Sequence, residues 1–378
     1  MSEKSLIEKS VIEKSLVANG NNYRIKRAIE RAKEGKKVTL AYIGGSITEG
    51  AGASSKKKCY AYQSYKHFKK AFGKDDGSNV EFVNAGMGGT SSAIGLVRYE
   101  RDVTSDGQVQ PDLVFIEFAV NDFEEPTKGV AYESLIRKIL KQGNKPGVVL
   151  IFSVFPSKWN LQDKYIPTGD YYNLAMISIK DAIVPELETG RLTDEDFFFD
   201  EYHPTDLGHA FMADCIMNYF AIVDKQPMEE SDIVIGELPK VGNSFEDIKM
   251  VDNKTDDDNV KIDKGSFTEV DLKVTSHFPD NWMKLNVKKN EAFKLTLNCK
   301  NILLLTKSTS DSSYGKAQVY VDGKLIKTID SSLAGGWNNA VIELILDTDV
   351  SSDHTLEIKM AQEDKDKRFT IMALAYSK

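Results

Sequence analysis

The chain has 378 residues, of which 41% are hydrophobic and 28% are charged, values typical of a soluble globular protein with room for two domains. Its formal net charge of -8 disfavours a nucleic-acid partner and favours a neutral or cationic one. No apolar stretch approaches the roughly 20 residues that cross a membrane, so we expect no membrane partner.

The N-terminal segment carries charged residues every few positions and has no apolar h-region, so it does not read as a secretory signal. Its echo, Ser-Leu-Ile-Glu-Lys then Ser-Val-Ile-Glu-Lys, spreads apolar residues around a helix rather than along one face. We interpret residues 1–20 as an arm or loose helix that docks on a neighbour, which hints at a homo-oligomer. The three cysteines, Cys59, Cys215 and Cys299, are few and far apart, which favours a reducing, cytoplasmic location.

Strand and helix patterns alternate between residues 21 and 224. This order predicts a parallel sheet covered by helices on both faces. The expected strands are 38–43, 80–83, 113–118 and 148–154. The expected helices lie near 25–32, 60–72, 91–101, 130–142, 170–187 and 206–221.

The pattern changes after residue 224. Residues 225–240 are typical of a linker, and 241–378 contain short alternating segments separated by turn signals such as Asp322-Gly323. These features predict an antiparallel β-sandwich. We interpret the acidic run at 256–258 as a solvated loop, and a calcium site there is the less favoured alternative.

Ser46 follows the first predicted strand of the parallel sheet. Gly44 and Gly45 break that strand and allow a tight turn, which leaves the serine at the carboxyl end of the strand. Ligands of open parallel sheets bind at that end. Ser46 is therefore a candidate nucleophile, provided that a base is near enough to accept its proton.

His203 is the best candidate for that base. Asp200 precedes it by three residues and Pro204 follows it, so a rigid loop would let the carboxylate bond one imidazole nitrogen while the other faces Ser46. The alternative is a surface histidine at the entry to a helix. Of the other four histidines, His209 is interpreted as structural and His67 as a surface residue, while His277 and His354 lack a paired carboxylate pattern; no His/Cys cluster has zinc-ligand spacing.

Acyl transfer also needs donors aimed at the developing oxyanion. Gly89 follows the second predicted strand and Asn121 the third, so both should converge near Ser46. The glycine offers a backbone N–H and the asparagine a side-chain amide. Either motif alone is also ordinary turn or loop sequence.

The four blocks centred on Ser46, Gly89, Asn121 and Asp200/His203 resemble those of the SGNH (GDSL-like) hydrolase superfamily, over about the first 220 residues. The first block reads Gly-Gly-Ser rather than Gly-Asp-Ser, and Ala119 stands where many members have glycine. The resemblance implies a flavodoxin-like three-layer α/β domain (21–224) and an ester hydrolase without a cofactor. It also implies that the Ser46 N–H joins Gly89 and Asn121 in an oxyanion hole.

The two-domain order resembles carbohydrate esterase family seventeen, with a C-terminal jelly-roll-like domain similar to carbohydrate-binding module family thirty-five. This resemblance implies O-acetylated oligosaccharides, mannan-type above all, as substrate. A lipase or thioesterase, or a non-catalytic glycan-binding protein, are the alternatives. The candidate sugar contacts are aromatic residues in loops: Trp159, Tyr202, Phe278, Trp282 and Trp337. For each of the two tryptophans in the second domain, Trp282 and Trp337, a core position is the favoured alternative.

Overall fold

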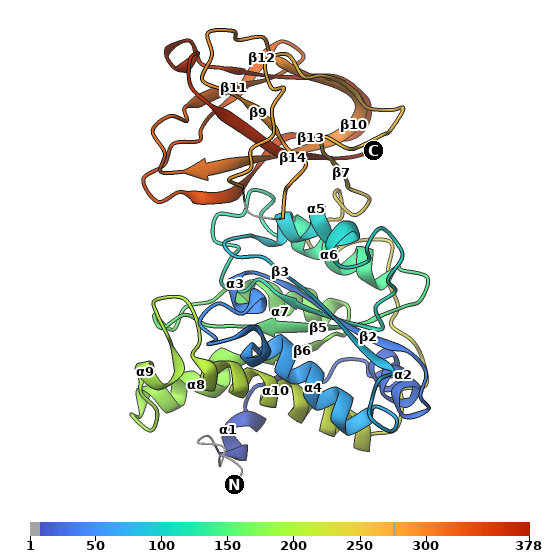
Figure 1. Cartoon of the computed structure of the whole chain (residues 1–378). Coiled ribbons are helices and arrows are strands. Elements are labelled where there is room, and N and C mark those ends of the chain that lie inside the picture. Colours follow the sequence, from blue (N-terminus) through green and yellow to red (C-terminus); the bar gives the residue numbers. More distant parts are fainter. Residues whose placement is uncertain (1–7, 275–276) are drawn as a thin grey trace. The chain divides into compact units, whose positions relative to one another are not determined.

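The computed structural model describes residues 8–274 and 277–378, which form two compact units (Figure 1). The first unit extends to Glu125 and resumes over Tyr132–Asn243; the second comprises Pro126–Ala131 and Ser244–Lys378. Within the described residues, no helix has both the length and the apolar character needed to span a membrane.

The first unit is built on a six-stranded sheet. Its strand order is β1-β6-β5-β4-β2-β3, in which β1 pairs antiparallel with β6 and the other neighbours are parallel. The parallel strands thus have the flavodoxin order. Strand β3 is added on one side of β2, and β4, β5 and β6 are added on the other, so the topological switch point lies between β2 and β4. The strands are β1 (Leu16–Ala18), β2 (Val38–Gly44), β3 (Val80–Gly86), β4 (Leu113–Glu117), β5 (Gly147–Phe152) and β6 (Ala175–Ser178).

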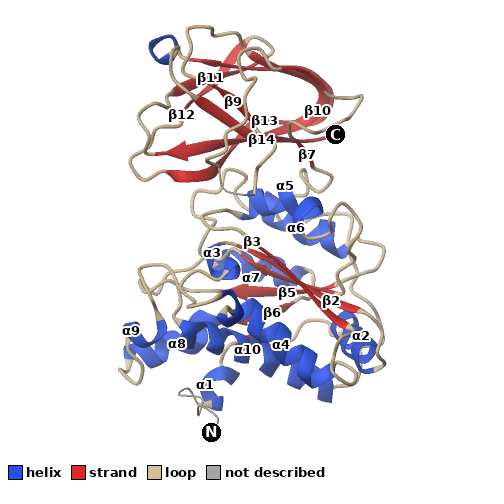
Figure 2. Cartoon of the chain, viewed as in Figure 1, coloured by secondary structure: helices blue, strands red, loops and turns tan. Residues whose placement is uncertain are grey.

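Helices cover both faces of this sheet (Figure 2). Helices α5 and α6 lie on one face and α4, α8 and α10 on the other (Figure 1). Strands β2, β4, β5 and β6 are buried along their whole length, as parallel strands between two helical layers must be. The helices are α1 (Lys9–Glu13), α2 (Tyr23–Lys33), α3 (Ser46–Glu49), η1 (Lys56–Lys58), α4 (Tyr60–Phe72), α5 (Ser92–Asp102), α6 (Val130–Leu140), α7 (Gln162–Tyr171), α8 (Ile179–Glu188), α9 (Asp194–Phe197) and α10 (Asp206–Lys225).

The predicted helix at 170–187 is wrong, because this segment contains a strand. Helix α7 ends at Tyr171, β6 follows as the fifth parallel strand, and α8 begins directly after it. Strand β6 has only four residues, Ala-Met-Ile-Ser, all of them buried. A short apolar run of this kind fits a buried helix as well as a buried strand, so periodicity cannot separate the two.

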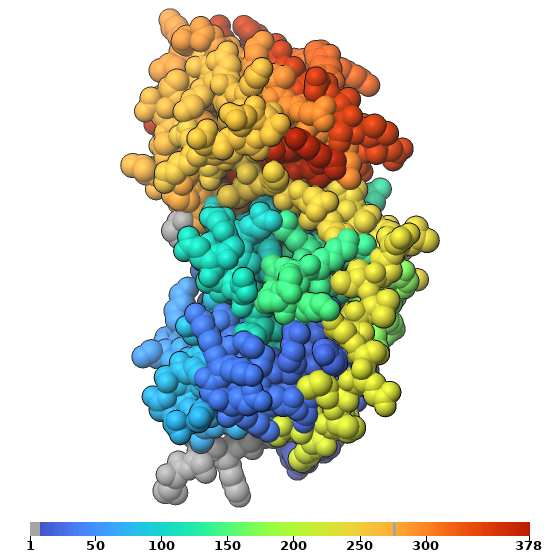
Figure 3. Space-filling model, turned by 90° about the vertical axis from the view of Figure 1, so that its right-hand side faces the viewer, coloured from blue at the N-terminus to red at the C-terminus, as the bar shows by residue number. Residues whose placement is uncertain are grey.

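The two segments that flank the predicted catalytic domain pack on the first unit. Residues 9–18 supply α1 and the edge strand β1, rather than a free arm. The predicted linker lies along the surface of the unit, in yellow in Figure 3. There Arg24 forms an ion pair with Asp232 (2.6 Å), and the buried Glu133 accepts a hydrogen bond from the Lys240 N–H (2.6 Å).

The second unit is antiparallel and is folded from one continuous sheet. The long strands β10 and β13 each bend: residues 293–299 of β10 pair with 352–358 of β13, and 301–309 pair with 337–347. Strand β11 extends the first half and β14 the second, which gives the two layers of a sandwich around one core. The strands are β7 (Lys249–Val251), β8 (Lys261–Asp263), β9 (Trp282–Lys284), β10 (Phe293–Thr309), β11 (Lys316–Val321), β12 (Lys324–Asp330), β13 (Trp337–Met360) and β14 (Phe369–Ser377), with a 3-10 turn η2 (Gln362–Asp364).

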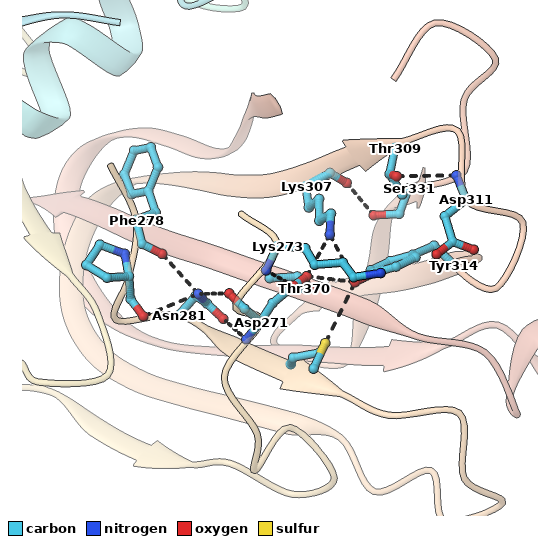
Figure 4. Close-up of polar contacts among 12 residues, drawn as sticks. Asp271, Lys273, Phe278, Asn281, Lys307, Thr309, Asp311, Tyr314, Ser331 and Thr370 are labelled. Carbon is cyan, nitrogen blue, oxygen red and sulfur yellow. Dashed lines mark hydrogen bonds and ion pairs between the residues drawn. The ribbon is translucent and has the colours of Figure 1, made fainter. Parts of the chain in front are cut away.

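A buried polar cluster ties a loop to this sheet (Figure 4). Oδ2 of Asp271 accepts hydrogen bonds from Lys307 Nζ (2.9 Å), the Tyr314 hydroxyl (2.7 Å) and the Thr370 hydroxyl (2.8 Å). The Asn281 side chain accepts from the Asp271 N–H at 2.8 Å. A buried carboxylate with this many donors is well compensated for the loss of water. In the acidic run at 256–258, Asp257 accepts from Tyr376 (2.9 Å), and no group of three or more metal-binding side chains occurs among the residues described.

Candidate active site

Ser46 lies at the point where the sheet reverses its direction of winding. It begins α3 directly after β2, and β2 lies between β3 and β4. The loop after β3 carries Gly89, and the loop after β4 carries Asn121. The topology therefore brings three of the four predicted blocks to one edge of the sheet, where ligands of open α/β folds bind.

The imidazole of His203 joins Ser46 to Asp200. Its Nε2 lies 3.0 Å from the Ser46 Oγ, and its Nδ1 lies 2.9 Å from both carboxylate oxygens of Asp200. Since Nδ1 faces a carboxylate, the tautomer with the proton on Nδ1 leaves Nε2 free to accept from the serine. This is the arrangement that activates a serine for nucleophilic attack.

The acidic member of this set is held in its ionised form. Burial raises the pKa of Asp200, but the hydrogen bond from His203 and the one from the Tyr202 N–H (2.8 Å) outweigh it, so the pKa is lowered. The His203 loop also fits closely against Gly52, which has a φ of +85°. A Cβ atom on Gly52 would lie 2.2 Å from the Pro204 carbonyl oxygen and 2.9 Å from the His203 Cβ.

The three candidate oxyanion donors have no hydrogen-bond partner among the described residues. The N–H groups of Ser46 and Gly89 donate to no acceptor in the described part of the chain, and neither does the side-chain amide of Asn121. Gly89 has a φ of +66°, a conformation that favours glycine. Donors without internal partners are available to an incoming acyl oxygen.

The residue after Asn121 anchors its loop. Asp122 is buried and accepts hydrogen bonds from the Ser92 N–H (2.7 Å) at the start of α5 and from the Tyr165 hydroxyl (2.5 Å). Burial raises the pKa of Asp122 to about 6, even though these hydrogen bonds lower it. The Asn121 loop is thus pinned to two helices from within the core.

Sequence analysis missed two buried ionisable side chains, Arg98 and Glu117, which form hydrogen bonds to the ends of β2 and β3 and to α3. Arg98 donates to the carbonyl oxygens of Ala85 (2.6 Å) and Gly44 (3.1 Å), at the ends of β3 and β2. Glu117, the last residue of β4, accepts from the Thr48 hydroxyl of α3 at 3.1 Å. A charged residue inside an apolar stripe is the sequence signal for Arg98, but it does not identify the acceptor.

A second serine–histidine–aspartate set occurs in the other unit. His354, for which the sequence offers no acidic partner, lies 2.7 Å from an Asp322 oxygen and 2.9 Å from the Ser352 hydroxyl. No local sequence pattern pairs these two residues; the turn between β11 and β12 brings Asp322 to His354. Ser352 lies within β13, opposite Cys299 of β10, whereas Ser46 follows the end of its strand and begins a helix.

The predicted sugar contacts divide by exposure. Tyr202 and Trp337 are about half exposed, at 53% each, and Trp159 is partly buried against the first core. Phe278 and Trp282 are buried at 2% and 1%. The prediction that Phe278 is exposed is therefore wrong. For Trp282 the core alternative is confirmed, because Trp282 begins β9 and packs against Phe293 in the core of the second unit.

Comparison with known proteins bears on both units. Residues 42–211 match the model of the GDSL-like Lipase/Acylhydrolase family. Over 97% of the chain, the structure superposes on a two-domain esterase (CEX) active on acetylated mannans, with a TM-score of 0.85, 29% identity and 99% of that chain covered. The same esterase co-crystallized with mannopentaose gives a TM-score of 0.84, 29% identity and 98% coverage of its chain.

No curated protein matches the chain by sequence. The family match runs from within β2 to the first part of α10 and contains every block of the candidate site. The two-domain likeness adds the antiparallel unit to the comparison. The chain therefore contains a GDSL-like lipase/acylhydrolase domain and is a carboxylic ester hydrolase.

Proposed function

We propose that this protein removes O-acetyl groups from oligosaccharides, those of mannan type above all, with Ser46 as nucleophile. The proposal rests on the 3.0 Å distance between Ser46 Oγ and His203 Nε2, together with the contact of Asp200 with Nδ1 of the same imidazole. The similarity to an esterase active on acetylated mannans supports the choice of substrate.

The reaction follows from the positions of these groups. Ser46 Oγ attacks the acetyl carbonyl carbon while His203 Nε2 takes its proton, and the carbonyl oxygen becomes an oxyanion. The N–H groups of Ser46 and Gly89 and the Asn121 amide stabilise that charge. His203 then returns the proton to the sugar oxygen as the ester bond breaks, which leaves acetyl-Ser46. Water activated by His203 cleaves this ester and releases acetate.

A matched pair of variants tests the assignment. Ser46→Ala should abolish acetate release from acetylated manno-oligosaccharides, measured by mass loss of acetyl groups. Ser352→Ala removes a serine with the same contacts to a histidine in the other unit and should retain wild-type activity. If Ser46→Ala still released acetate at the wild-type rate, the assignment of Ser46 as nucleophile would be refuted.

A lipase or thioesterase is the second candidate, in line with the family description. Hydrolysis rates on acetyl and octanoyl esters, which differ in acyl-chain length, distinguish it from an acetylesterase. A preference for octanoyl over acetyl esters would select the second candidate. Glycan binding without turnover of any ester would select a non-catalytic protein. Acetylated xylan and pectin fragments, assayed beside mannan, decide the sugar.

Three further assignments belong to this proposal. Trp159, Tyr202 and Trp337 are proposed to contact the sugar, and loss of affinity in their alanine variants tests them. A cytoplasmic location fits the three cysteines, which are free and buried, and cell fractionation tests it. Light scattering tests whether the protein forms a homo-oligomer. The sequence argument for an oligomer depended on a free N-terminal arm, and α1 and β1 instead pack on the first unit.

A further inference from the structure

Four aromatic side chains form a continuous row that leads to His203. The ring of Phe123 packs edge-on against Trp159 (centroids 5.9 Å apart), and Trp159 stacks on Phe155 (6.0 Å). Phe155 in turn packs edge-on against Tyr202 (5.5 Å), whose ring lies 6.1 Å from the imidazole of His203. We call Phe123, Trp159, Phe155 and Tyr202 the aromatic row.

The two ends of the aromatic row adjoin the two sides of the candidate site. Phe123 follows Asn121 by two residues, and Tyr202 directly precedes His203. The middle of the row comes from the loop after β5, which closes on itself through a hydrogen bond from the Phe155 N–H to the Trp159 carbonyl oxygen (3.2 Å). The row therefore runs from the segment that carries Asn121 to the segment that carries His203.

The row is rigid at its centre and open at its ends. Phe155 and Trp159 pack against the apolar core, and the Leu161 N–H donates to the Ala119 carbonyl oxygen (2.8 Å), which ties this loop to the Asn121 loop. Phe123 and Tyr202, by contrast, are 69% and 53% exposed. Exposed aromatic rings held on a fixed support beside a candidate active site favour a binding surface.

The chemistry of the row selects a flat ligand with an apolar face. Its rings offer π-faces and edges, with the Tyr202 hydroxyl as a polar tip, and Phe123 and Trp159 carry no charge. The C–H face of a pyranose fits such a surface, while its hydroxyls remain in water. An acyl chain would also gain from apolar burial, but it has no need of a flat ring.

We propose that the aromatic row is the subsite for the sugar ring of the acetylated substrate, with Phe123 and Tyr202 as the residues that determine specificity for the sugar. This inference rests on the proposed function. The acetyl group lies at Ser46, and the sugar ring to which it is bonded lies along the row.

The test compares substrates with and without a ring. Phe123→Ala and Tyr202→Ala should each lower kcat/KM on acetylated manno-oligosaccharides by about tenfold more than on ethyl acetate, chiefly through KM. Phe123→Leu, which keeps apolar area but loses the flat face, should behave as Phe123→Ala does. Phe199→Ala is the matched control, since Phe199 is 68% exposed in the same loop region but outside the row.

Each other outcome overturns the inference. Equal losses on both substrates would make the row structural, and unchanged kinetics would leave it without a role. Recovery by Phe123→Leu together with a selective loss on octanoyl esters would assign the row to an acyl chain. If the wild type hydrolyses ethyl acetate through Ser46 but does not deacetylate any oligosaccharide, both the proposed substrate and this inference are wrong. If the wild type deacetylates oligosaccharides and the variants of the aromatic row behave like Phe199→Ala, only this inference is wrong.

Discussion

Gly45 and Asn121 are in such close contact that no side chain fits between them. A Cβ atom on Gly45 would lie 2.2 Å from Oδ1 of Asn121 and 2.8 Å from its Nδ2. The absence of a side chain at residue 45 is therefore what allows the amide of Asn121 to approach the turn that carries Ser46. The first and third sequence blocks depend on each other sterically.

Gly45→Ala should displace the Asn121 amide and lower kcat by about 10²–10³, the usual cost of losing one oxyanion donor. The backbone φ of Gly45 is -84°, which alanine adopts readily, so the loss arises from the contact and not from backbone strain. Gly143→Ala is the control, because nothing lies within 4 Å of its added methyl group. Steady-state kinetics on an acetyl ester measure both, and wild-type kcat in Gly45→Ala would contradict the donor role of Asn121.

Arg98→Lys should disturb two loops at once. A lysine keeps the charge but cannot bridge the carbonyl oxygens of Gly44 and Ala85 as the guanidinium does. We expect a loss of about 3 kcal/mol in the free energy of unfolding and a lower kcat, measured well below the melting temperature. Arg101→Lys is the control, since Arg101 also bonds Asp102 but contacts neither carbonyl. Equal effects of the two substitutions would show that only the ion pair with Asp102 matters.

Glu117 should make the first unit less stable as pH rises. Burial raises the pKa of Glu117 from 4.5 to about 7, while the hydrogen bond from the Thr48 hydroxyl lowers it. Between these values the folded state keeps a proton that the unfolded state has released, so the free energy of unfolding falls as pH increases. The fall from this group amounts to roughly 3 kcal/mol and is complete above pH 7.

Glu117→Gln removes that titration. Its stability relative to the wild type should therefore be more favourable at pH 8 than at pH 5 by up to about 3 kcal/mol, measured by urea unfolding at both pH values. Glu195→Gln, at an exposed position of α9, is the matched surface variant measured beside it. A constant difference between wild type and Glu117→Gln across this range would mean that the carboxyl is ionised throughout.

Much of this site can be predicted from the sequence, because its residues follow successive strands of a parallel sheet. Blocks that follow successive strands must meet at one edge, so the proximity of Ser46, Gly89 and Asn121 follows from the strand pattern alone. The Asp-x-x-His spacing similarly predicts the contact between His203 and Asp200, which the structure places at 2.9 Å.

Features that depend on long-range packing could not be predicted in this way. The register that brings Asp322 to His354 is set by strand pairing, which local sequence does not specify. In the sequence Trp282 lies among turn residues, a position typical of an exposed ligand contact, but in the folded sheet its side chain is buried. The short strand β6 has no periodicity of its own, and its neighbours in the sheet determine its conformation.

Lys307→Met should destabilise the second unit, because it leaves the Asp271 carboxylate buried without its cation. Burial raises the pKa of Asp271, but the hydrogen bonds from Lys307, Tyr314 and Thr370 outweigh it and lower the pKa. The stability that this carboxylate contributes is therefore present above its unfolded pKa and is lost as pH falls. Breaking a buried pair from one side costs about 3–5 kcal/mol.

Chemical unfolding, followed by a probe in the second unit at neutral pH, measures this cost. Adding Asp271→Asn to Lys307→Met should recover part of the loss, because the double variant buries no unpaired charge. Lys294→Met is the surface control: Lys294 pairs with Glu357 at 3.2 Å, both side chains are partly exposed, and the expected change is below about 1 kcal/mol. If Lys307→Met changes stability no more than Lys294→Met does, the cluster in Figure 4 does not hold the loop against the sheet, and the sandwich core alone fixes it.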